Sequence, residues 1–204
     1  MKLLLASNGQ FLIDSGYGLL GIPKDQLRIG YVITAAKAAR NRDYVKAHEQ
    51  LMKDRGYFFK EFDIEDKSQQ EIYDFFKDKN ILHVEGGNTF YLLRAIKASG
   101  FDKIIRELLG RGIVYVGTSA GASIAGPTIE MSSHIPPGTP PEELIALNLV
   151  PLVIKAHYTP DKAEEFKSLM NKIKHPVKFL TNGQGLLVQD DKVELVGEGE
   201  EVKL

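Results

Sequence analysis

The sequence predicts an α/β fold in which a doubly wound, mostly parallel sheet lies between two helical layers and ends in a C-terminal antiparallel hairpin. Short apolar runs rich in Val, Ile, Leu and Tyr alternate with amphipathic stretches along the first half of the chain, the pattern of a parallel sheet covered on both faces. Several amphipathic stretches stop near a glycine, as helices often do. The length of 204 residues suits one domain over residues 1–204, because such a chain buries roughly 70% of its unfolded surface in one core.

Each element follows from its local pattern. The apolar runs predict strands at residues 2–6, 27–34, 57–62, 81–85, 113–117 and 152–157. Helical spacing predicts helices at residues 44–55, 68–77, 89–99, 101–109 and 161–174. The segment IPPGTPPEE holds four of the nine prolines, so we expect an irregular surface loop there. The last strands are expected at residues 177–181, 185–189 and 193–196, the final two joined by a turn at Asp190 and Asp191.

Composition excludes several classes of function. The chain carries 26 basic and 27 acidic residues, a formal net charge of −1, and no Lys/Arg-rich block. Nucleic acid is therefore not expected as a partner, because its binding depends on a basic surface. The absence of cysteine excludes disulfides, thiolate catalysis and sulfur-ligated metals. No GxxxxGK[ST] loop and no HExxH pair occurs, so we expect no metal site and no cofactor.

The opening segment MKLLLAS has too short an apolar stretch for a signal peptide or a membrane-spanning helix. We therefore expect a cytoplasmic protein without a membrane partner. A homodimer is left open as the assembly.

Polar side chains stand at the ends of several expected strands, where functional groups gather in open α/β sheets. These positions are Ser7 and Asn8, EGGNTF at 85–90, GTSAGAS at 117–123 and AHYTPD at 156–161.

The segment GTSAG fits the GxSxG pattern and lies between the apolar run IVYVG and the small-residue run AGASIAG. This context predicts a sharp strand-to-helix turn that exposes the Ser119 hydroxyl, with Gly117 and Gly121 letting neighbouring backbone pass closely. The helix that follows offers free N–H groups at its start, and we expect the Ala120 amide to stabilise an oxyanion. Ser119 is therefore the expected nucleophile.

The segment EGGNTF places two glycines at a strand end, followed by a helix that opens at Asn88 and Thr89. Its backbone amides are expected at the same sheet edge as Ser119, with the Gly87 N–H as the second oxyanion donor. We expect Asn88 and Thr89 to contact the substrate.

A serine nucleophile needs a base, and the chain has five histidines. We interpret His48, His83 and His175 as structural or solvent-exposed, since they fall within a helix, within a strand and just before a proline. His157 ends a buried strand and is the expected base. His134 lies in the proline-rich region and is a candidate substrate contact.

Five segments together resemble the peptidase E family (S51), serine peptidases of the class I glutamine-amidotransferase-like fold. The segments are GGNTF at 86–90, GTSAGAS at 117–123, GPTIE at 126–130, ALNLVPLVIKAHYT at 146–159 and TNGQGLLV at 181–188. The resemblance implies an aspartyl dipeptidase, with a small peptide as the partner that it binds. It also implies Ser119 as nucleophile, His157 as base, and Gly87 and Ala120 as oxyanion donors.

The chain departs from this family at two acidic positions. The resemblance implies a triad glutamate where Asn182 stands, and an assisting aspartate where His134 stands. An asparagine can orient the His157 ring without bringing charge to the imidazolium. We therefore expect Asn182 as the third catalytic residue, with Asp161 and Glu130 as acidic substitutes left open.

A further departure concerns the substrate. The resemblance implies an arginine after the base histidine that holds the substrate carboxylate, but the chain has no arginine beyond Arg111. Three lysines could supply the charge, namely Lys155, Lys162 and Lys167. An ammonium does not reproduce a bidentate guanidinium, so strict preference for aspartate is not expected.

Some motifs of the chain also occur in other classes of protein. The segment GYGLLG at 16–21 matches GxGxxG but lies about ten residues beyond the first strand, which disfavours a dinucleotide site. An α/β esterase also uses GxSxG, but its partners follow in the order serine, acid, histidine. The other alternative is a weakly active or inactive relative that binds a small acidic peptide or amino acid. We expect a serine exopeptidase that cleaves short peptides with an acidic N-terminal residue.

Overall fold

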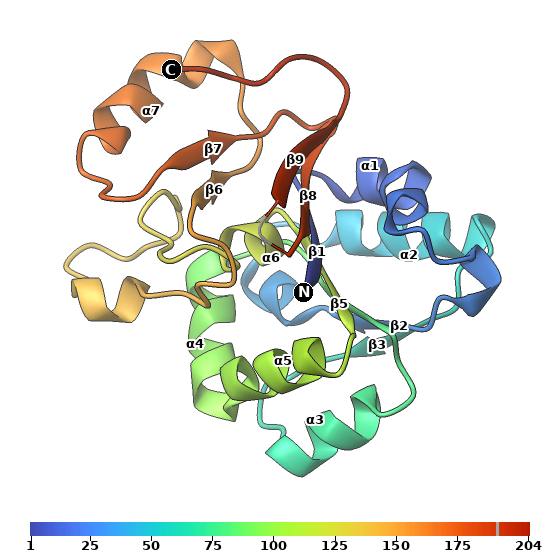
Figure 1. The fold of residues 1–204 in the computed structure, drawn as a ribbon. Coiled ribbons are helices and arrows are strands. Elements are labelled where there is room, and N and C mark those ends of the chain that lie inside the picture. Colours follow the sequence, from blue (N-terminus) through green and yellow to red (C-terminus); the bar gives the residue numbers. More distant parts are fainter. Residues whose placement is uncertain (191) are drawn as a thin grey trace.

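The centre of the molecule is a twisted seven-stranded sheet (Figure 1). A computed structural model describes residues 1–190 and 192–204 of the chain. From edge to edge, the strands are β3 (Phe59–Phe62), β2 (Ile29–Val32), β4 (Ile81–Val84), β5 (Val114–Thr118), β1 (Lys2–Ala6), β8 (Gln184–Gln189) and β9 (Lys192–Gly197). The first five are parallel, whereas β8 pairs antiparallel with β1 and β9 antiparallel with β8.

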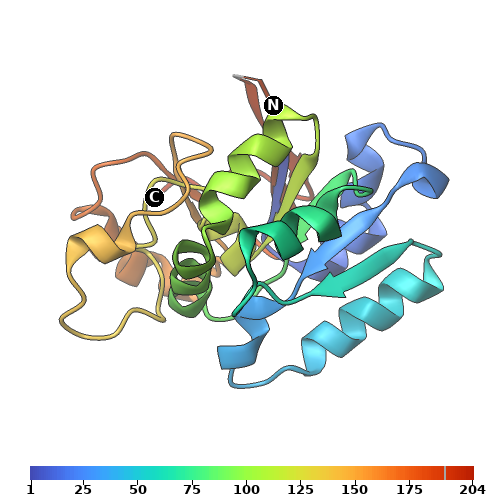
Figure 2. The same cartoon turned by 90° about the horizontal axis from the view of Figure 1, so that it is seen from below.

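Helices cover both faces of this sheet (Figure 2). On one face, α1 (Gly9–Asp14) and α2 (Asp43–Asp54) share an apolar cluster with Leu4 of β1. On the other, Leu3 belongs to the cluster formed with α3, α4, α5 and α6, which span Gln69–Phe76, Thr89–Ser99, Phe101–Gly110 and Ala120–Ser123. Neighbouring residues of β1 thus face opposite layers, as a strand requires. The central strands are buried along their whole length, which explains their continuous apolar runs.

A second, two-stranded parallel sheet lies beside the carboxyl edge of the large one (Figure 1). It pairs β6 (Val153–Lys155) with β7 (Val177–Phe179), and α7 (Ala163–Met170) packs on it through Phe166. The sequence predicts these strands but does not reveal that they pair with each other. The reason is that pairing depends on where distant segments lie.

The expected fold class is confirmed: the sheet is mostly parallel, flanked by helices, and closed by the antiparallel pair β8–β9. Most predicted elements are present with ends displaced by a few residues. The predicted turn between the last strands includes Asp190, which has a positive φ of 52°, and Asp191, which lies outside the described residues.

Short irregular elements account for the remaining differences. The GYGLLG segment forms a 3₁₀ helix, Gly16–Leu20, whose Tyr17 and Leu20 enter the core. It is therefore a packing element and not a phosphate loop. Further 3₁₀ helices are Lys24–Gln26, Thr34–Ala38, Pro141–Leu144 and Pro160–Lys162.

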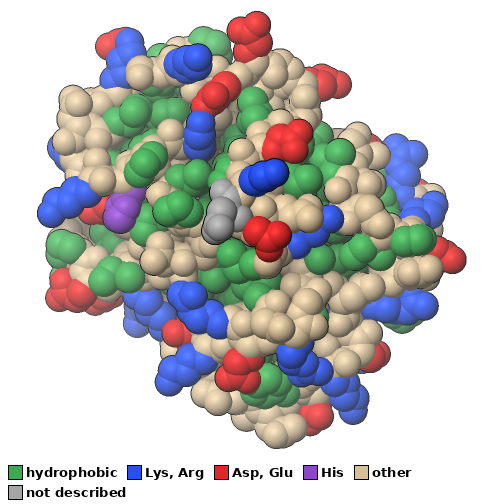
Figure 3. Space-filling model, viewed as in Figure 1, with side chains coloured by type: hydrophobic (Ala, Val, Ile, Leu, Met, Phe, Trp, Pro, Cys, Tyr) green, Lys and Arg blue, Asp and Glu red, His purple; other side chains and the backbone are tan. Residues whose placement is uncertain are grey.

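Side chains of both charge signs are scattered over the face in Figure 3, as expected from the net charge of −1. Of the helices formed by residues 1–190 and 192–204, none combines the length and apolar character needed to cross a membrane.

Candidate active site

Three parallel strands bring functional groups to one edge of the large sheet. Ser7 follows β1, Glu85 follows β4 and Ser119 follows β5, and these strands are neighbours in the order β4-β5-β1. The Ser119 N–H extends the pairing of β5 with β1 by donating to the Ala6 carbonyl at 2.9 Å. This hydrogen bond fixes the position of Ser119 at the carboxyl end of β5.

Ser119 has a strained backbone, with φ 50° and ψ −104°. A non-glycine residue in this region costs on the order of 1–3 kcal/mol and persists only where its surroundings enforce it. The backbone bonds from Ser119 N–H to Ala6 and from Ser123 N–H to Ser119 hold the residue, and the flanking glycines permit the close packing around it. A Cβ on Gly117 would lie 2.4 Å from the Gly121 carbonyl oxygen, and one on Gly121 would lie 2.0 Å from the Val84 carbonyl oxygen. The turn requires both glycines, which gives the GxSxG pattern its physical reason.

His157 lies between Ser119 and Asn182. Its Nε2 is 2.9 Å from the Ser119 Oγ, and its Nδ1 is 2.7 Å from the Asn182 Oδ1. An amide oxygen only accepts hydrogen bonds, so this contact assigns the ring proton to Nδ1. The Nε2 lone pair then faces the serine hydroxyl, as a general base requires.

His157 is anchored to the large sheet through Ser7. The His157 N–H donates to the Ser7 Oγ at 2.8 Å, and this hydroxyl donates to the Leu180 carbonyl at 3.2 Å. Ser7 is fully buried, and His157 adopts a positive φ of 59°. The sequence places Ser7 at a strand end, but no local signal indicates that its hydroxyl holds the small sheet against the large one.

The Gly86–Gly87 turn packs against Ser119. A Cβ on Gly86 would lie 3.1 Å from the Ser119 Cβ, and Gly87 has a φ of 140° that L-residues rarely adopt. Ala120 is the first residue of α6, so its N–H has no partner within that helix. Within the described ranges, the Gly87 N–H likewise donates no backbone hydrogen bond. Among the described residues, neither expected oxyanion donor therefore has a backbone partner for its N–H.

A buried polar network supports this turn from behind. The Glu85 carboxylate accepts hydrogen bonds from Tyr31, from the His48 Nδ1 at 3.0 Å and from the Gly86 N–H at 2.6 Å. Burial alone would raise the pKa of Glu85, but the His48 hydrogen bond and nearby charge lower it to about 2. Glu85 therefore stays ionised, and sequence reasoning assigned it no role.

His83 belongs to the same network. Its Nδ1 lies 2.7 Å from the Tyr17 hydroxyl, and its Nε2 lies 2.8 Å from the Thr118 Oγ1. Complete burial lowers the pKa of His83 to about 4, so the ring is neutral near pH 7. The structural roles expected for His48 and His83 agree with these contacts.

Ser119 and His157 lie where two cavities meet. The first has a volume of about 240 Å³ and is lined by Thr89, Lys155, Lys162 and Glu165 among others. The second, of about 830 Å³, is lined by Gly87, Asn88 and Arg40 among others. His134 and Ser133 line both. All three expected substrate contacts therefore border the space around Ser119.

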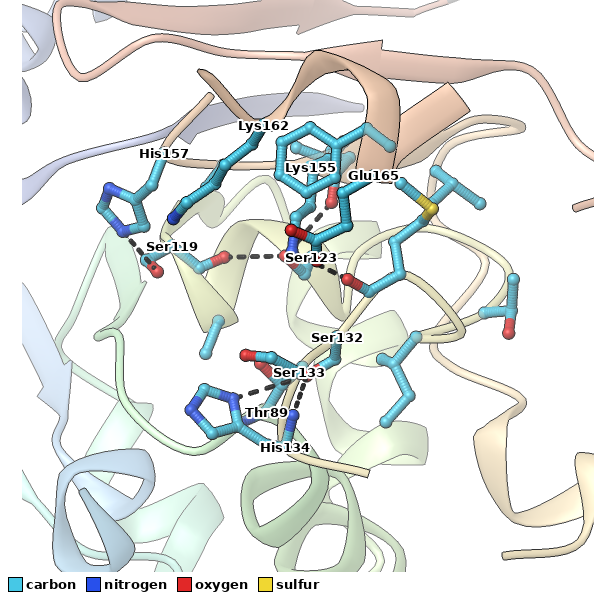
Figure 4. Close-up of a pocket in the computed structure, with 18 residues that line it drawn as sticks. Thr89, Ser119, Ser123, Ser132, Ser133, His134, Lys155, His157, Lys162 and Glu165 are labelled. Atoms are coloured by element: carbon cyan, nitrogen blue, oxygen red, sulfur yellow. Dashed lines mark hydrogen bonds between the residues drawn. The ribbon is translucent and has the colours of Figure 1, made fainter. Parts of the chain in front are cut away.

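The first cavity contains two of the three expected lysines. Figure 4 shows Lys162 extending toward His157 and Ser119. The Lys155 Nζ donates to the Met131 carbonyl at 2.8 Å and lies 5.0 Å from the centre of the Phe166 ring. Burial lowers the pKa of Lys155, although Glu165 opposes this effect. Lys167 instead pairs with Glu164 on the surface and does not border the cavity.

The remaining expected groups differ in position. His134 is exposed at the rim of both cavities, and desolvation together with Lys155 and Arg40 lowers its pKa. The Asn88 side-chain oxygen caps α4 by accepting from the Tyr91 N–H at 2.9 Å. Asp161 and Glu130, the acidic substitutes, border neither cavity.

Comparison with known proteins places this site in a family. The model of Peptidase family S51 matches residues 4–196. The chain belongs to this family. Its serine-type peptidase activity follows from the family, and the matched range includes Ser119, His157 and Asn182.

Individual proteins similar to this S51 peptidase are themselves named as peptidases. An uncharacterized peptidase of Listeria innocua is 31% identical over 177 residues, covering 81% of this chain and 82% of its own. Peptidase E of Nostoc is 29% identical over 182 residues, covering 83% and 72%. A crystal structure of a candidate peptidase E protein from Listeria monocytogenes is 25% identical, with a TM-score of 0.83 and coverage of 97% and 98%. The resemblance to peptidase E that the sequence predicts is therefore confirmed.

Proposed function

We propose that this S51 peptidase hydrolyses short peptides with an acidic N-terminal residue through an acyl-enzyme on Ser119. The observation that carries the proposal is the continuous contact from the Ser119 Oγ to His157 Nε2 and from His157 Nδ1 to Asn182. Nucleophilic catalysis requires a nucleophile, a base and a group that orients the base, each within hydrogen-bond reach of the next.

In the proposed reaction, the Ser119 Oγ attacks the first peptide carbonyl while His157 Nε2 takes its proton. The Gly87 and Ala120 N–H groups stabilise the resulting oxyanion. His157 then gives the proton to the leaving amine, and the C–N bond breaks to leave an ester on Ser119. Water, deprotonated by His157, releases the acid and restores the hydroxyl. Asn182 holds the ring in the tautomer that each step needs.

The preference for an acidic first residue is supported by Lys155 and Lys162 in the first cavity. Both supply positive charge close to the nucleophile, and neither forms a planar fork that fits a single carboxylate position. The enzyme should therefore accept N-terminal glutamate as well as aspartate.

The proposal is tested by hydrolysis of aminoacyl p-nitroanilides and of X-Leu dipeptides. We expect the wild type to cleave substrates in which X is Asp or Glu, and Ser119→Ala to be inactive on all of them. Equal inactivity of both proteins, with acidic ligands still bound, would replace the proposal with a binding function. Cleavage confined to simple esters would favour an esterase.

A further inference from the structure

The second cavity differs from the first in its charge. It shares Ser119, His157 and His134 with the first cavity but includes neither Lys155 nor Lys162. Its volume of about 830 Å³ against about 240 Å³ also makes it the roomier of the two. Whatever occupies the second cavity therefore meets different partners from those of the acidic side chain in the proposed function.

Besides the histidines, the lining contains two ionisable groups that carry charge near pH 7, Glu85 and Arg40. Glu85 is 0% exposed, and its carboxylate is occupied by Tyr31, His48 and the Gly86 N–H. It therefore has no free oxygen to offer a ligand. The cavity presents no other acidic side chain.

Arg40 is the available charge. It lies in the exposed segment between the 3₁₀ helix Thr34–Ala38 and α2, and its guanidinium pairs with no carboxylate in the described part of the chain. The charge of Arg40 also acts on His134, which lines both cavities. The pKa of His134 is lowered mainly by desolvation, then by Lys155, and to a smaller extent by Arg40. An unpaired guanidinium beside a cavity favours a planar anion that accepts two hydrogen bonds.

A dipeptide with an acidic first residue carries two carboxylates, one on each side of the bond to be cleaved. Ser119 and His157 mark the position of that bond, where the cavities meet. The small cavity with two lysines suits the acidic side chain of the first residue. The second residue, whose side chain varies, then extends into the larger cavity and carries its α-carboxylate toward Arg40.

We infer that the second cavity is the subsite for the leaving amino acid and that Arg40 binds its free α-carboxylate. This inference rests on the proposed function and adds a length restriction to it. Peptides that end after the second residue gain the ion pair, whereas longer or C-terminally amidated peptides do not.

The inference is tested by steady-state kinetics with Asp-Leu, its C-terminal amide and Asp-p-nitroanilide. In Arg40→Ala, we expect kcat/KM for Asp-Leu to fall roughly 10- to 100-fold, the range for loss of a hydrogen bond to a charged group. The fall should come from a higher KM, with kcat little changed. The amide and the anilide keep the aspartate side chain but lack the C-terminal α-carboxylate, so they should change less than twofold. Arg40→Lys should recover part of the loss. The matched control is Arg42→Ala, which removes a nearby arginine that does not line the cavity.

Two outcomes would overturn the assignment. One is an equal effect of Arg40→Ala on the free acid and the amide, and the other is no effect on either. If the wild type cleaves none of the three substrates, the proposed function fails. Calorimetric binding to Ser119→Ala, with and without Arg40→Ala, then decides the subsite separately. Loss of the preference for Asp-Leu over its amide in the double variant supports it, and absence of that preference in Ser119→Ala alone refutes it.

Discussion

His157 Nδ1 lies 2.7 Å from the side-chain oxygen of Asn182, so an uncharged amide holds the imidazole that faces Ser119. The amide fixes the tautomer, because its oxygen can accept only from an N–H. It brings no negative charge to the imidazolium that forms when the serine is deprotonated. Orientation is thus provided by Asn182 while charge stabilisation is left to the surroundings.

This division of roles predicts opposite effects of two substitutions. Asn182→Ala removes the orienting contact and should lower kcat on the order of 100-fold, within the range of general-base catalysis. Asn182→Asp keeps the contact and adds a charge, so kcat should rise. Both are measured on Asp-p-nitroanilide, with melting temperatures as the control for folding. A lower kcat in Asn182→Asp would mean that the pocket is built for an amide.

The backbone of Ser119 allows a test that separates strain from chemistry. Ser119→Ala and Ser119→Gly both remove the hydroxyl that we propose as the nucleophile, and both should be inactive. Glycine accepts φ 50° without a Cβ penalty. Ser119→Gly should therefore be more stable than Ser119→Ala by about 1 kcal/mol in urea unfolding. Equal stabilities would show that the turn does not strain residue 119.

The buried His83 predicts a loss of stability in mild acid. Its pKa is about 4 in the folded protein against about 6.5 in an unfolded chain. Between these values the unfolded chain binds a proton that the native protein does not, so stability falls as the pH falls. From pH 7 to pH 5, this residue should account for up to about 2 kcal/mol. Below that, Glu85 adds a further loss as the pH approaches its pKa of about 2.

The measurement is the free energy of urea unfolding at pH 7 and pH 5. His83→Gln removes the titrating ring, so the difference between the two pH values should shrink. His175→Gln, at an exposed histidine, is the matched control and should leave the difference as in the wild type. The role of His83 is refuted if its substitution changes stability equally at both pH values.

The cations of the first cavity predict a selective effect on substrate choice. Lys162→Met should raise KM roughly tenfold for Asp-p-nitroanilide, as expected for loss of a hydrogen-bonded charge, with little change for Ala-p-nitroanilide. Lys167→Met, whose ammonium lies outside the cavity, is the control and should affect neither. An equal rise in KM for both substrates would indicate that Lys162 shapes the cavity but does not recognise the substrate carboxylate.

Local sequence signals predict the helices, strands and turns of this protein better than they predict the contacts between distant segments. The helix Thr89–Ser99 has the predicted ends, because Asn88 caps its start and Gly100 takes the left-handed conformation after its end. The turn at Ser119 is equally local, since its glycines are neighbours in the chain. By contrast, the carboxylate of Glu85 finds His48 and Tyr31 on other segments. No pattern around residue 85 reports those contacts.

The same distinction applies to the site. The residues Ser119, His157 and Asn182 each stand near a strand end, and family resemblance connects them in the sequence. The contact between Ser7 and His157 spans 150 positions and depends on how the small sheet lies against the large one. The cavity that contains Arg40 likewise forms only once the segment before α2 has folded beside the Gly86–Gly87 turn.

The hydrogen bond between Ser7 and His157 also bears on how the enzyme loses activity on heating. Ser119 follows a strand of the large sheet and His157 follows a strand of the small one, which has two short strands and its own modest apolar cluster. Local opening of that sheet would separate the base from the serine while the large sheet remains intact. Heat inactivation would then precede global melting and, while the rest of the fold holds, reverse on cooling.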